Sequence, residues 1–259
     1  MNGGNFVDAV IYECKAGIAY LTLNRPERRN ALSRAVREGL RDGFLRFDHD
    51  ESAQVLIITG QGRDAFCAGA DLKEMAEEAI GIPGRDFMPI LNRNMWVTKP
   101  VIAAVNGAAL GGGFLLAMMC DLAVASTEAT FGMPEAKWSR GAPWSVPLNW
   151  MIPQRVWMEM ALTGEPISAE RAYAIGLVNR VVPAEQLMAA AEELAQKIRD
   201  NAPLTVAATR RMIYLTTEMG RTAAWDVADA LFEPVYASED ALEGPRAFKE
   251  RRRPQWKGR

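Results

Sequence analysis

Residues 101–120 read VIAAVNGAALGGGFLLAMMC, a run of twenty residues without a charged side chain. A membrane span has this length, but four glycines and Asn106 interrupt the run, and glycine is costly inside a continuous helix. The stretch divides more naturally into a buried strand at 101–105, a loop of small residues at 106–113 and a buried helix at 114–125. It therefore predicts an α/β unit rather than a transmembrane helix.

The segments before this unit predict further strands. Residues 9–24 alternate in period two around Ala16-Gly17, which is typical of two short strands. The segment VLIIT at 55–59 is apolar throughout except for its last residue, so we expect a strand buried on both faces of a parallel sheet. Strand, crossover helix and strand in series place the chain in the α/β class.

Two helices are expected between these strands. Asn30 and Ser33 are candidate caps of a helix at 35–47, whose apolar residues recur at helical spacing. The turn-rich stretch GQGRDAFCAGAD leads into a second helix at 72–79.

The chain becomes mostly helical after about Met151. Strong amphipathic patterns cover residues 188–200 and 206–219, with Asn201-Ala202-Pro203 between them. We expect residues 1–200 to form the core and residues 201–259 to form a helical C-terminal region.

Charge is placed unevenly along a chain whose net charge is −2. Residues 245–259 hold seven Lys or Arg side chains against Glu250, a local balance of +6. The other 244 residues therefore carry −8, which argues against a body that binds nucleic acid. The basic segment is either a solvated tail or a site for an anionic partner.

Cysteine and histidine usage excludes several classes of protein. Cys14, Cys67 and Cys120 are far apart and form no CxxC pair, so we expect neither a disulfide framework nor a zinc site, and a reducing cytoplasm fits. The first ten residues lack the pattern of a signal peptide. His49 lies in the charged stretch FDHDES, which favours a solvated turn over a hydrolytic triad.

The nucleotide signatures are weak or absent. Residues 60–65 formally match G-x-G-x-x-A, but a small-residue turn follows where a helix should begin. The chain contains no G-x-x-x-x-G-K-[ST] motif.

Two loops of small residues, at 68–71 and 109–113, follow the probable buried strands. Small side chains let a ligand approach backbone N–H groups, and two such donors that converge on one oxygen form an oxyanion hole. Close packing of helix on strand would also select small residues. The two loops together favour the oxyanion hole.

Six segments, in this order, resemble the enoyl-CoA hydratase/isomerase, or crotonase, family. They cover nearly the whole chain: NRPERRNALS (24–33), DAFCAGADLKEM (64–75), KPVIAAVNGAALGGG (99–113), ATFGMPE (129–135), LTGEPISAERAYAIGLVNRVVP (162–183) and EGPRAFKERRRPQWKGR (243–259). The resemblance implies a spiral of ββα units, a helical C-terminal oligomerisation region, and homotrimers commonly paired into hexamers. It also implies an acyl-CoA substrate, with no other cofactor and no metal.

The resemblance assigns roles to particular residues. It makes the N–H groups of Ala70 and Gly112 the oxyanion donors and Glu135 the catalytic carboxylate. Candidate contacts to the substrate or to CoA are Arg28, Arg29, Ala68, Asp71, Leu72, Lys73, Leu115, Trp138, Phe248 and Arg251.

The chain departs from the family pattern at one catalytic position. The family's hydratases use two glutamates, and Leu115 stands where one of them is expected. Residues 136–150 replace the usual glycine-rich turn and are rich in tryptophan; Trp138 and Trp144 line the pocket, the core or a subunit interface.

A single glutamate favours isomerase-like proton transfer. One carboxylate can remove a proton at one carbon of a thioester and return it at another, whereas hydration more naturally uses a second carboxylate to orient water. The alternatives are a hydratase or carnitinyl-CoA-dehydratase-like lyase that works with Glu135 alone, and a CoA-thioester binder without turnover. A dinucleotide-dependent oxidoreductase would instead bind NAD, which we do not expect.

Overall fold

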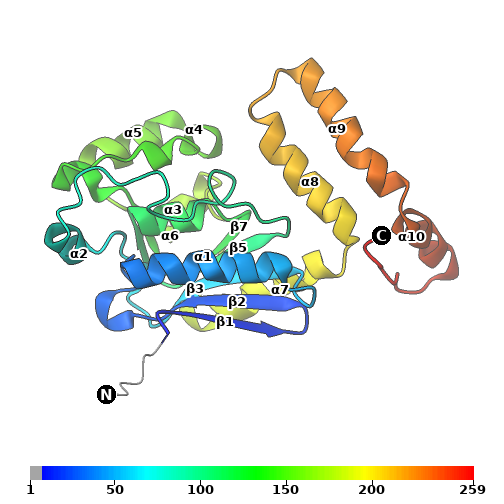
Figure 1. The fold of residues 1–259 in the computed structure, drawn as a ribbon, viewed down its shortest axis with the longest axis horizontal. Coiled ribbons are helices and arrows are strands. Elements are labelled where there is room, and N and C mark those ends of the chain that lie inside the picture. Colours follow the sequence, from blue (N-terminus) through cyan, green and yellow to red (C-terminus); the bar gives the residue numbers. More distant parts are fainter. Residues whose placement is uncertain (1–7) are drawn as a thin grey trace.

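The computed structural model describes residues 8–259 and confirms the α/β class (Figure 1). Its larger sheet has the order β1-β2-β3-β5-β7-β10: β1 (Val10–Lys15), β2 (Ile18–Leu23), β3 (Val55–Gly60), β5 (Val101–Val105), β7 (Leu122–Ser126) and β10 (Arg180–Val182). Its smaller sheet has the order β4-β6-β8-β9: β4 (Ala65–Cys67), β6 (Ala108–Leu110), β8 (Thr130–Gly132) and β9 (Ile167–Ser168).

Helices follow the strand pairs and then dominate the C-terminal half. The α-helices are α1 (Arg34–His49), α2 (Leu72–Glu77), α3 (Gly112–Met118), α4 (Leu148–Met151), α5 (Gln154–Thr163), α6 (Ala169–Ala174), α7 (Leu187–Arg199), α8 (Pro203–Thr216), α9 (Arg221–Tyr236) and α10 (Glu239–Glu250). Short 3-10 helices are η1 (Pro26–Arg28), η2 (Pro134–Trp138), η3 (Pro143–Ser145) and η4 (Ala184–Gln186).

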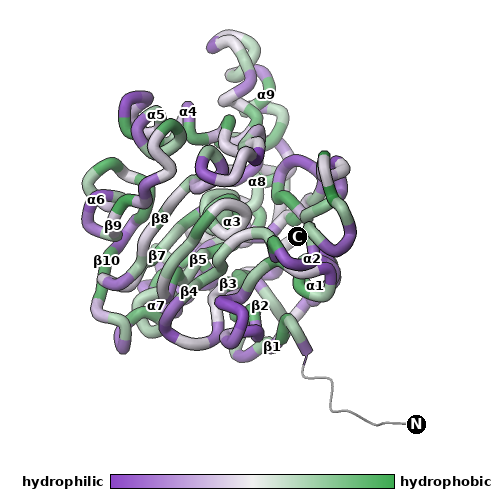
Figure 2. Tube along the Cα trace, turned by 90° about the vertical axis from the view of Figure 1, so that its left-hand side faces the viewer, coloured by the Kyte–Doolittle hydropathy of each residue, from purple (hydrophilic) through white to green (hydrophobic). Residues whose placement is uncertain are grey.

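The two sheets are built by successive strand pairs. β3, β5 and β7 lie parallel in the larger sheet, and the strand after each, β4, β6 and β8, lies parallel in the smaller one. β1 and β2 are antiparallel to each other, and so are β8 and β9. Figure 2 shows the larger sheet as the succession β10, β7, β5, β3, β2 and β1. The chain therefore has the predicted run of ββα units.

The strand predicted at 55–59 is confirmed as buried on both faces. Leu56 and Ile58 of β3 belong to the main core, whereas Val55 and Ile57 pack in a second core under α7. A strand between two apolar layers needs apolar side chains at every position, which explains its lack of alternation.

The helix predicted at 114–125 is wrong in its second half. α3 ends at Met118, and residues 122–126 form β7 beside β5. Asp121 makes the turn: its N–H donates to the Val101 carbonyl at 2.9 Å, and its Oδ2 accepts from the Val101 N–H at 2.7 Å. The predicted loop at 106–113 also contains a strand, β6.

The capping prediction for α1 needs correction. Ser33 is the N-cap residue by position, but its side chain makes no capping hydrogen bond, and the Glu74 carboxylate accepts from the Arg34 N–H at 2.8 Å instead. Asn30 lies outside the helix, where its amide donates to the carbonyls of Gln61 and Ala65. The first amide of α1 is thus paired by a side chain from α2.

The helices α8, α9 and α10 project from one side of the body (Figure 1). α8 is anchored by Arg210, whose Nε donates to the Asp121 carboxylate at 2.8 Å and whose Nη1 donates to the Val97 carbonyl at 2.7 Å. The Tyr214 hydroxyl donates to the same carboxylate. In contrast, no residue of α9, all of which the structure describes, is buried in the single chain.

The apolar run at residues 101–120 forms β5, β6 and α3 and not a membrane helix. Within residues 8–259, no helix combines the length and the apolar composition needed to cross a membrane.

Candidate active site

Two small-residue loops meet at neighbouring strand ends. β4 and β6 are parallel neighbours in the smaller sheet, so the loops that leave their carboxyl ends lie side by side. A side-chain carbon at Gly69 would come within 2.7 Å of the Leu110 carbonyl and 3.5 Å of the Gly112 nitrogen. Gly69 also has a φ of +92°, which other residues rarely adopt. Glycine is therefore required for this close approach.

The amides of Ala70 and Gly112 remain available at this junction. Nearby backbone hydrogen bonds use other groups: the Leu32 N–H donates to the Gly69 carbonyl, and the Gly111 N–H donates to the Gly132 carbonyl. Within the described part of the chain, neither the Ala70 N–H nor the Gly112 N–H donates a hydrogen bond to a protein acceptor.

Glu135 lies against the second loop. It is the second residue of η2, which directly follows β8, the strand paired with β6. Gly111 has a φ of +52°, and a side-chain carbon there would come within 3.1 Å of Oε1 of Glu135. The carboxyl group is therefore next to the residue that precedes Gly112.

The Glu135 carboxyl group has two unequal oxygens. Oε1 accepts a hydrogen bond from Nε1 of Trp144, on η3, at 3.1 Å. Oε2 is buried and has no hydrogen-bond partner among residues 8–259. Burial raises the pKa of Glu135 above the usual value of a glutamate, although a backbone hydrogen bond and the Trp144 indole partly oppose the shift.

Trp144 is a site residue whose bond to Glu135 the sequence did not predict. Nine positions separate it from Glu135, and the chain between them turns back through Ser139, which has a left-handed backbone. The density of tryptophan in this segment was the only available signal. It did not distinguish Trp144 from Trp138, which is 61% exposed at the end of η2.

Leu115 lies one helical turn beyond the loop. Its N–H donates to the Gly111 carbonyl at 3.0 Å, and its side chain is 4% exposed within the core. An apolar group there adds no hydrogen-bonding partner to the site.

The loop before α2 combines structural and exposed residues. Asp71 caps α2 by accepting from the Glu74 N–H, and its carboxylate pairs with Arg25 at 3.4 Å. The Ala68 N–H donates to the Arg29 carbonyl. Leu72 and Lys73, the first residues of α2, are exposed.

The predicted CoA contacts are distributed over distant elements. Arg28 and Arg29 are exposed in and after η1, on the body of the molecule. Phe248 and Arg251 are exposed at the end of α10, on the helices that project from the body (Figure 1).

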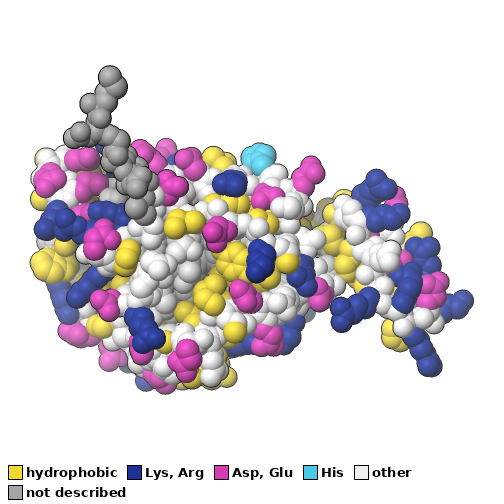
Figure 3. All heavy atoms as spheres, turned by 90° about the horizontal axis from the view of Figure 1, so that it is seen from below, with side chains coloured by type: hydrophobic (Ala, Val, Ile, Leu, Met, Phe, Trp, Pro, Cys, Tyr) yellow, Lys and Arg dark blue, Asp and Glu magenta, His cyan; other side chains and the backbone are white. Residues whose placement is uncertain are grey.

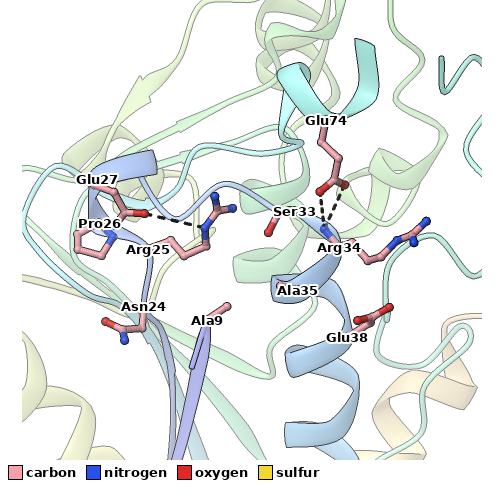
Figure 4. A pocket seen from close by; sticks show the side chains of 10 residues that line it. All are labelled: Ala9, Asn24, Arg25, Pro26, Glu27, Ser33, Arg34, Ala35, Glu38 and Glu74. Atoms are coloured by element: carbon pink, nitrogen blue, oxygen red, sulfur yellow. Dashed lines mark hydrogen bonds and ion pairs between the residues drawn. The ribbon is translucent and has the colours of Figure 1, made fainter. Parts of the chain in front are cut away.

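Two cavities have residues of α2 on their walls. One of about 810 Å³ lies between η1 and the start of α1, with Arg25 and Arg34 on its wall and Glu74 of α2 beside them (Figure 4). Another of about 320 Å³ is lined by α2, residues 79–81 and Arg140. Neither cavity includes Ala70, Gly112 or Glu135.

The other reactive side chains of residues 8–259 lie apart from the two loops or are buried. His49 is exposed at the end of α1 and bonds to the Leu45 carbonyl. The Cys67 thiol, on the strand before the first loop, is buried, and burial raises its pKa to about 12. Within residues 8–259, no three His, Cys, Asp or Glu side chains gather as metal ligands would. A dinucleotide site requires a helix directly after its glycine-rich turn. The segment 60–65 instead leads from β3 into β4.

The basic C-terminal segment is partly neutralised within the chain. Arg246 and Arg252 pair with the buried Glu243, and these partners, Arg252 above all, hold its pKa well below the usual range. Glu239 pairs with Lys257 and Arg259. Figure 3 shows basic side chains gathered over this projecting end. The segment is thus neither a free tail nor a fully available cationic site.

Comparisons with known proteins agree with the motif pattern. A model of the enoyl-CoA hydratase/isomerase family matches residues 13–259. A carnitinyl-CoA dehydratase from Salmonella typhi is 41% identical over 254 residues, which cover 93% of this chain and 95% of that protein. A carnitinyl-CoA dehydratase from Proteus mirabilis (strain HI4320) is 38% identical over 257 residues, with 95% and 97% covered.

The fold is also that of a solved relative. The crystal structure of an enoyl-CoA hydratase from Mycobacterium marinum matches with a TM-score of 0.91 at 39% identity, covering 98% of this chain and 100% of that chain. This match confirms the predicted crotonase-type fold, with its ββα spiral and C-terminal helices.

Proposed function

The chain belongs to the enoyl-CoA hydratase/isomerase family, and from this premise we propose that it moves the double bond of an enoyl-CoA thioester by enolate-type proton transfer. As a family member it is an acyl-CoA enzyme. The proposal concerns which reaction of the family it performs and which residues perform it.

The proposed base is Glu135. The α-proton of a thioester is weakly acidic, so its removal needs a positioned base and stabilisation of the enolate. Burial raises the pKa of Glu135, which makes it a stronger base near neutral pH. Its position against Gly111 is the observation that carries the proposal, because it puts a carboxylate beside a candidate oxyanion donor.

The proposed oxyanion hole consists of the N–H groups of Ala70 and Gly112. Support comes from the close approach of their loops and from the lack of another acceptor for either N–H within residues 8–259. The thioester oxygen would accept both hydrogen bonds as the enolate forms. Glu135 would then take the proton from C2 of a 3-enoyl thioester and return it to C4, which leaves a 2-enoyl thioester.

The surroundings of Glu135 favour isomerisation over hydration. Leu115 stands where the family's hydratases have a second glutamate, so it supplies no carboxylate to orient water. A double-bond shift needs no water and no second acid or base.

A hydro-lyase is the second candidate, because the similar proteins are named carnitinyl-CoA dehydratase and enoyl-CoA hydratase. In that reaction Glu135 alone would activate water and transfer the proton.

Substrate contacts outside the reacting centre are also proposals. The cavity beside Leu72 and Arg140 suits the apolar part of an acyl group, since α2 begins two residues after Ala70. Arg28, Arg29 and Lys73 are exposed cations on elements next to the loops and are candidates for CoA phosphates. The substrate brings its own CoA, and the proton transfer requires no resident cofactor.

The test compares panels of 3-enoyl-CoA and 2-enoyl-CoA thioesters in deuterated water. An isomerised product has the same mass as its substrate except for any deuterium taken up, whereas a hydrated product is heavier by one water. We expect 3-enoyl substrates to give 2-enoyl products, with solvent deuterium only to the extent that the proton held by Glu135 exchanges with solvent before it is returned to C4. Hydration products alone would favour the hydro-lyase, and turnover of neither panel would refute both candidates.

The control is Glu135→Gln. This substitution should lower turnover by roughly 10²–10⁴-fold while thioester binding persists, because a positioned acid/base contributes about that factor. Near-normal activity of the variant would exclude Glu135 as the base.

A further inference from the structure

The proposed proton transfer uses Glu135 and two backbone N–H groups, and it assigns no role to the hydrogen bond from Trp144 to Glu135. Its donor comes from residues 136–150, where the sequence departs from the family's usual turn. The bond joins η3 to η2 and reaches the one carboxyl group that the reaction uses.

The indole of Trp144 is held in a defined orientation. The edge of its ring system contacts Phe114 of α3, with centroids 6.0 Å apart and planes at 82°. Phe114 in turn packs against Phe131 of β8 at 5.8 Å. At the next residue, the Ser145 hydroxyl donates to the Ala142 carbonyl at 2.7 Å, which fixes the turn that carries the indole. The N–H therefore points at Glu135 because of the core packing behind it.

This arrangement makes the two carboxylate oxygens chemically different. Oε1 already accepts a hydrogen bond, whereas Oε2 is buried without a partner in the described chain. A buried polar atom without a partner is uncommon and costly, and such atoms are found where a ligand or substrate supplies the partner. Oε2 is thus the oxygen whose hydrogen-bonding capacity no group of the described chain uses.

We infer that Trp144 is a positioning residue that holds Glu135 through Oε1 and leaves Oε2 as the single oxygen that exchanges a proton with the substrate. The inference rests on the proposed role of Glu135. The same oxygen removes the proton at one carbon and returns it at the other. Hydration would instead need one oxygen both to hold water and to move a proton, so the indole N–H disfavours hydration.

No nearby charge substitutes for this hydrogen bond. η3 and α3 carry no ionisable side chain. On η2, Lys137 is exposed and paired with Glu165, while Arg140, just beyond it, donates to the carbonyls of Ile80 and Gly81. On α5, Arg155 and Glu159 are exposed.

The test is Trp144→Phe, which keeps an aromatic ring against Phe114 but removes the N–H. The indole N–H stabilises the ionised carboxylate, so its loss should raise the pKa of Glu135 and move the acidic limb of the kcat/KM profile up by about one pH unit. We also expect kcat to fall about tenfold with KM within about twofold, since orientation in the transition state is lost. The share of hydrated product should rise, because Oε1 becomes free for water.

The matched control is Trp150→Phe, six residues after Trp144 in α4 and 57% exposed. It should leave the pH profile and the product ratio unchanged. A purely structural role of Trp144 would lower the melting temperature without moving the acidic limb or the product ratio, and that outcome would overturn the inference.

A second measurement does not depend on the folding of the variant. The chain has seven tryptophans. In ¹H–¹⁵N spectra of the wild-type protein, one indole N–H resonance should shift with pH across the acidic limb, and in Glu135→Gln none should. If no indole resonance follows the limb, the inference fails. If the Glu135→Gln variant remains active, both the proposed function and this inference fail. If Glu135→Gln is inactive but Trp144→Phe behaves like the wild type, only the inference fails.

Discussion

The properties of Glu135 follow from two neighbours, one that the family pattern predicts and one that it does not. The loop residue Gly111 admits the carboxyl group, and Trp144 binds one of its oxygens. The motif ending in Pro134-Glu135 marks Glu135 as the candidate carboxylate from sequence, and its contact with Gly111 comes from the structure. The second depends on where a turn of nine residues brings an indole, and local sequence does not encode that position.

The raised pKa of Glu135 has a consequence for stability. Because the pKa in the folded state lies above that of the unfolded chain, the folded state binds more protons, and stability rises as pH falls through the folded-state pKa. At higher pH the buried, ionised group is destabilising. Glu135→Gln should therefore melt higher than the wild type at pH 8, by about a few degrees, and by less at pH 5. An equal difference at both pH values, measured by thermal unfolding, would show that ionisation is not its source.

Substitution of Leu115 by glutamate tests whether the lack of a second carboxylate explains the preference for isomerisation. Leu115→Glu should increase hydration relative to isomerisation, measured by product mass. It should also lower the melting temperature, because position 115 is 4% exposed and a carboxyl group there is desolvated.

Leu115→Gln is the control for this substitution. It introduces a polar group of similar size without a base, so the melting temperature should fall while the product ratio stays the same. No shift in the ratio for Leu115→Glu would mean that other residues determine the reaction.

At the scale of elements, the errors of prediction share one cause. The run from 114 to 125 is apolar throughout apart from Asp121, and a buried helix and a buried strand look alike in such a run. The pairing of β7 with β5 decides the outcome, and that pairing involves residues about twenty positions apart. The three-residue β6 is too short to leave a pattern of its own. In contrast, α7 was predicted correctly because its amphipathic pattern is long, and β3 because polar and turn residues bound its short apolar run on both sides.

The ion pairs of α10 change how the basic segment should be tested. Arg252 bonds to the buried Glu243, so reversing its charge would damage the helix itself. Arg251 is exposed and makes no ion pair within residues 8–259. Arg251→Glu should raise KM for CoA thioesters several-fold, about the effect of losing one surface contact to a phosphate, with little change in kcat. The increase in KM should be smaller at high salt, because salt screens this contact.

A truncated pantetheine thioester provides the control for Arg251→Glu, because it lacks the nucleotide phosphates. Its KM should not respond to the substitution. Equal effects on both substrates would refute a phosphate role for the segment.

At the scale of the whole molecule, the projecting helices differ in what they contact: α8 packs against its own body, whereas α9 and α10 expose apolar side chains. The pairing of Arg210 and Tyr214 with Asp121 attaches α8 to its own body. Beyond it, α9 and α10 leave large apolar side chains exposed: Trp225 at 64%, Tyr236 at 78% and Phe248 at 88%. Apolar surface of this extent marks an interaction site. We therefore propose that α9 and α10 pack against a second copy of the chain.

The assembly that this surface predicts is a trimer or a pair of trimers. A cyclic trimer uses heterologous interfaces, in which each subunit offers one surface and receives another, and this suits a projecting helical region. Deletion of residues 201–259 should give insoluble or inactive protein. That deletion also removes the partners of Asp121, so a surface substitution is the sharper test.

Trp225→Glu is that substitution, since Trp225 is largely exposed in the single chain and its loss should not unfold a subunit. At micromolar concentration the wild type should sediment as a trimer or hexamer, and the variant as a smaller species with weaker activity toward CoA thioesters. We expect the activity to fall if, as proposed, the basic end of α10, which projects from the body of its own chain (Figure 1), contacts the nucleotide of a neighbouring subunit's substrate. A wild-type monomer with full activity at that concentration would contradict both the assembly and the sharing of the C-terminal segment between subunits.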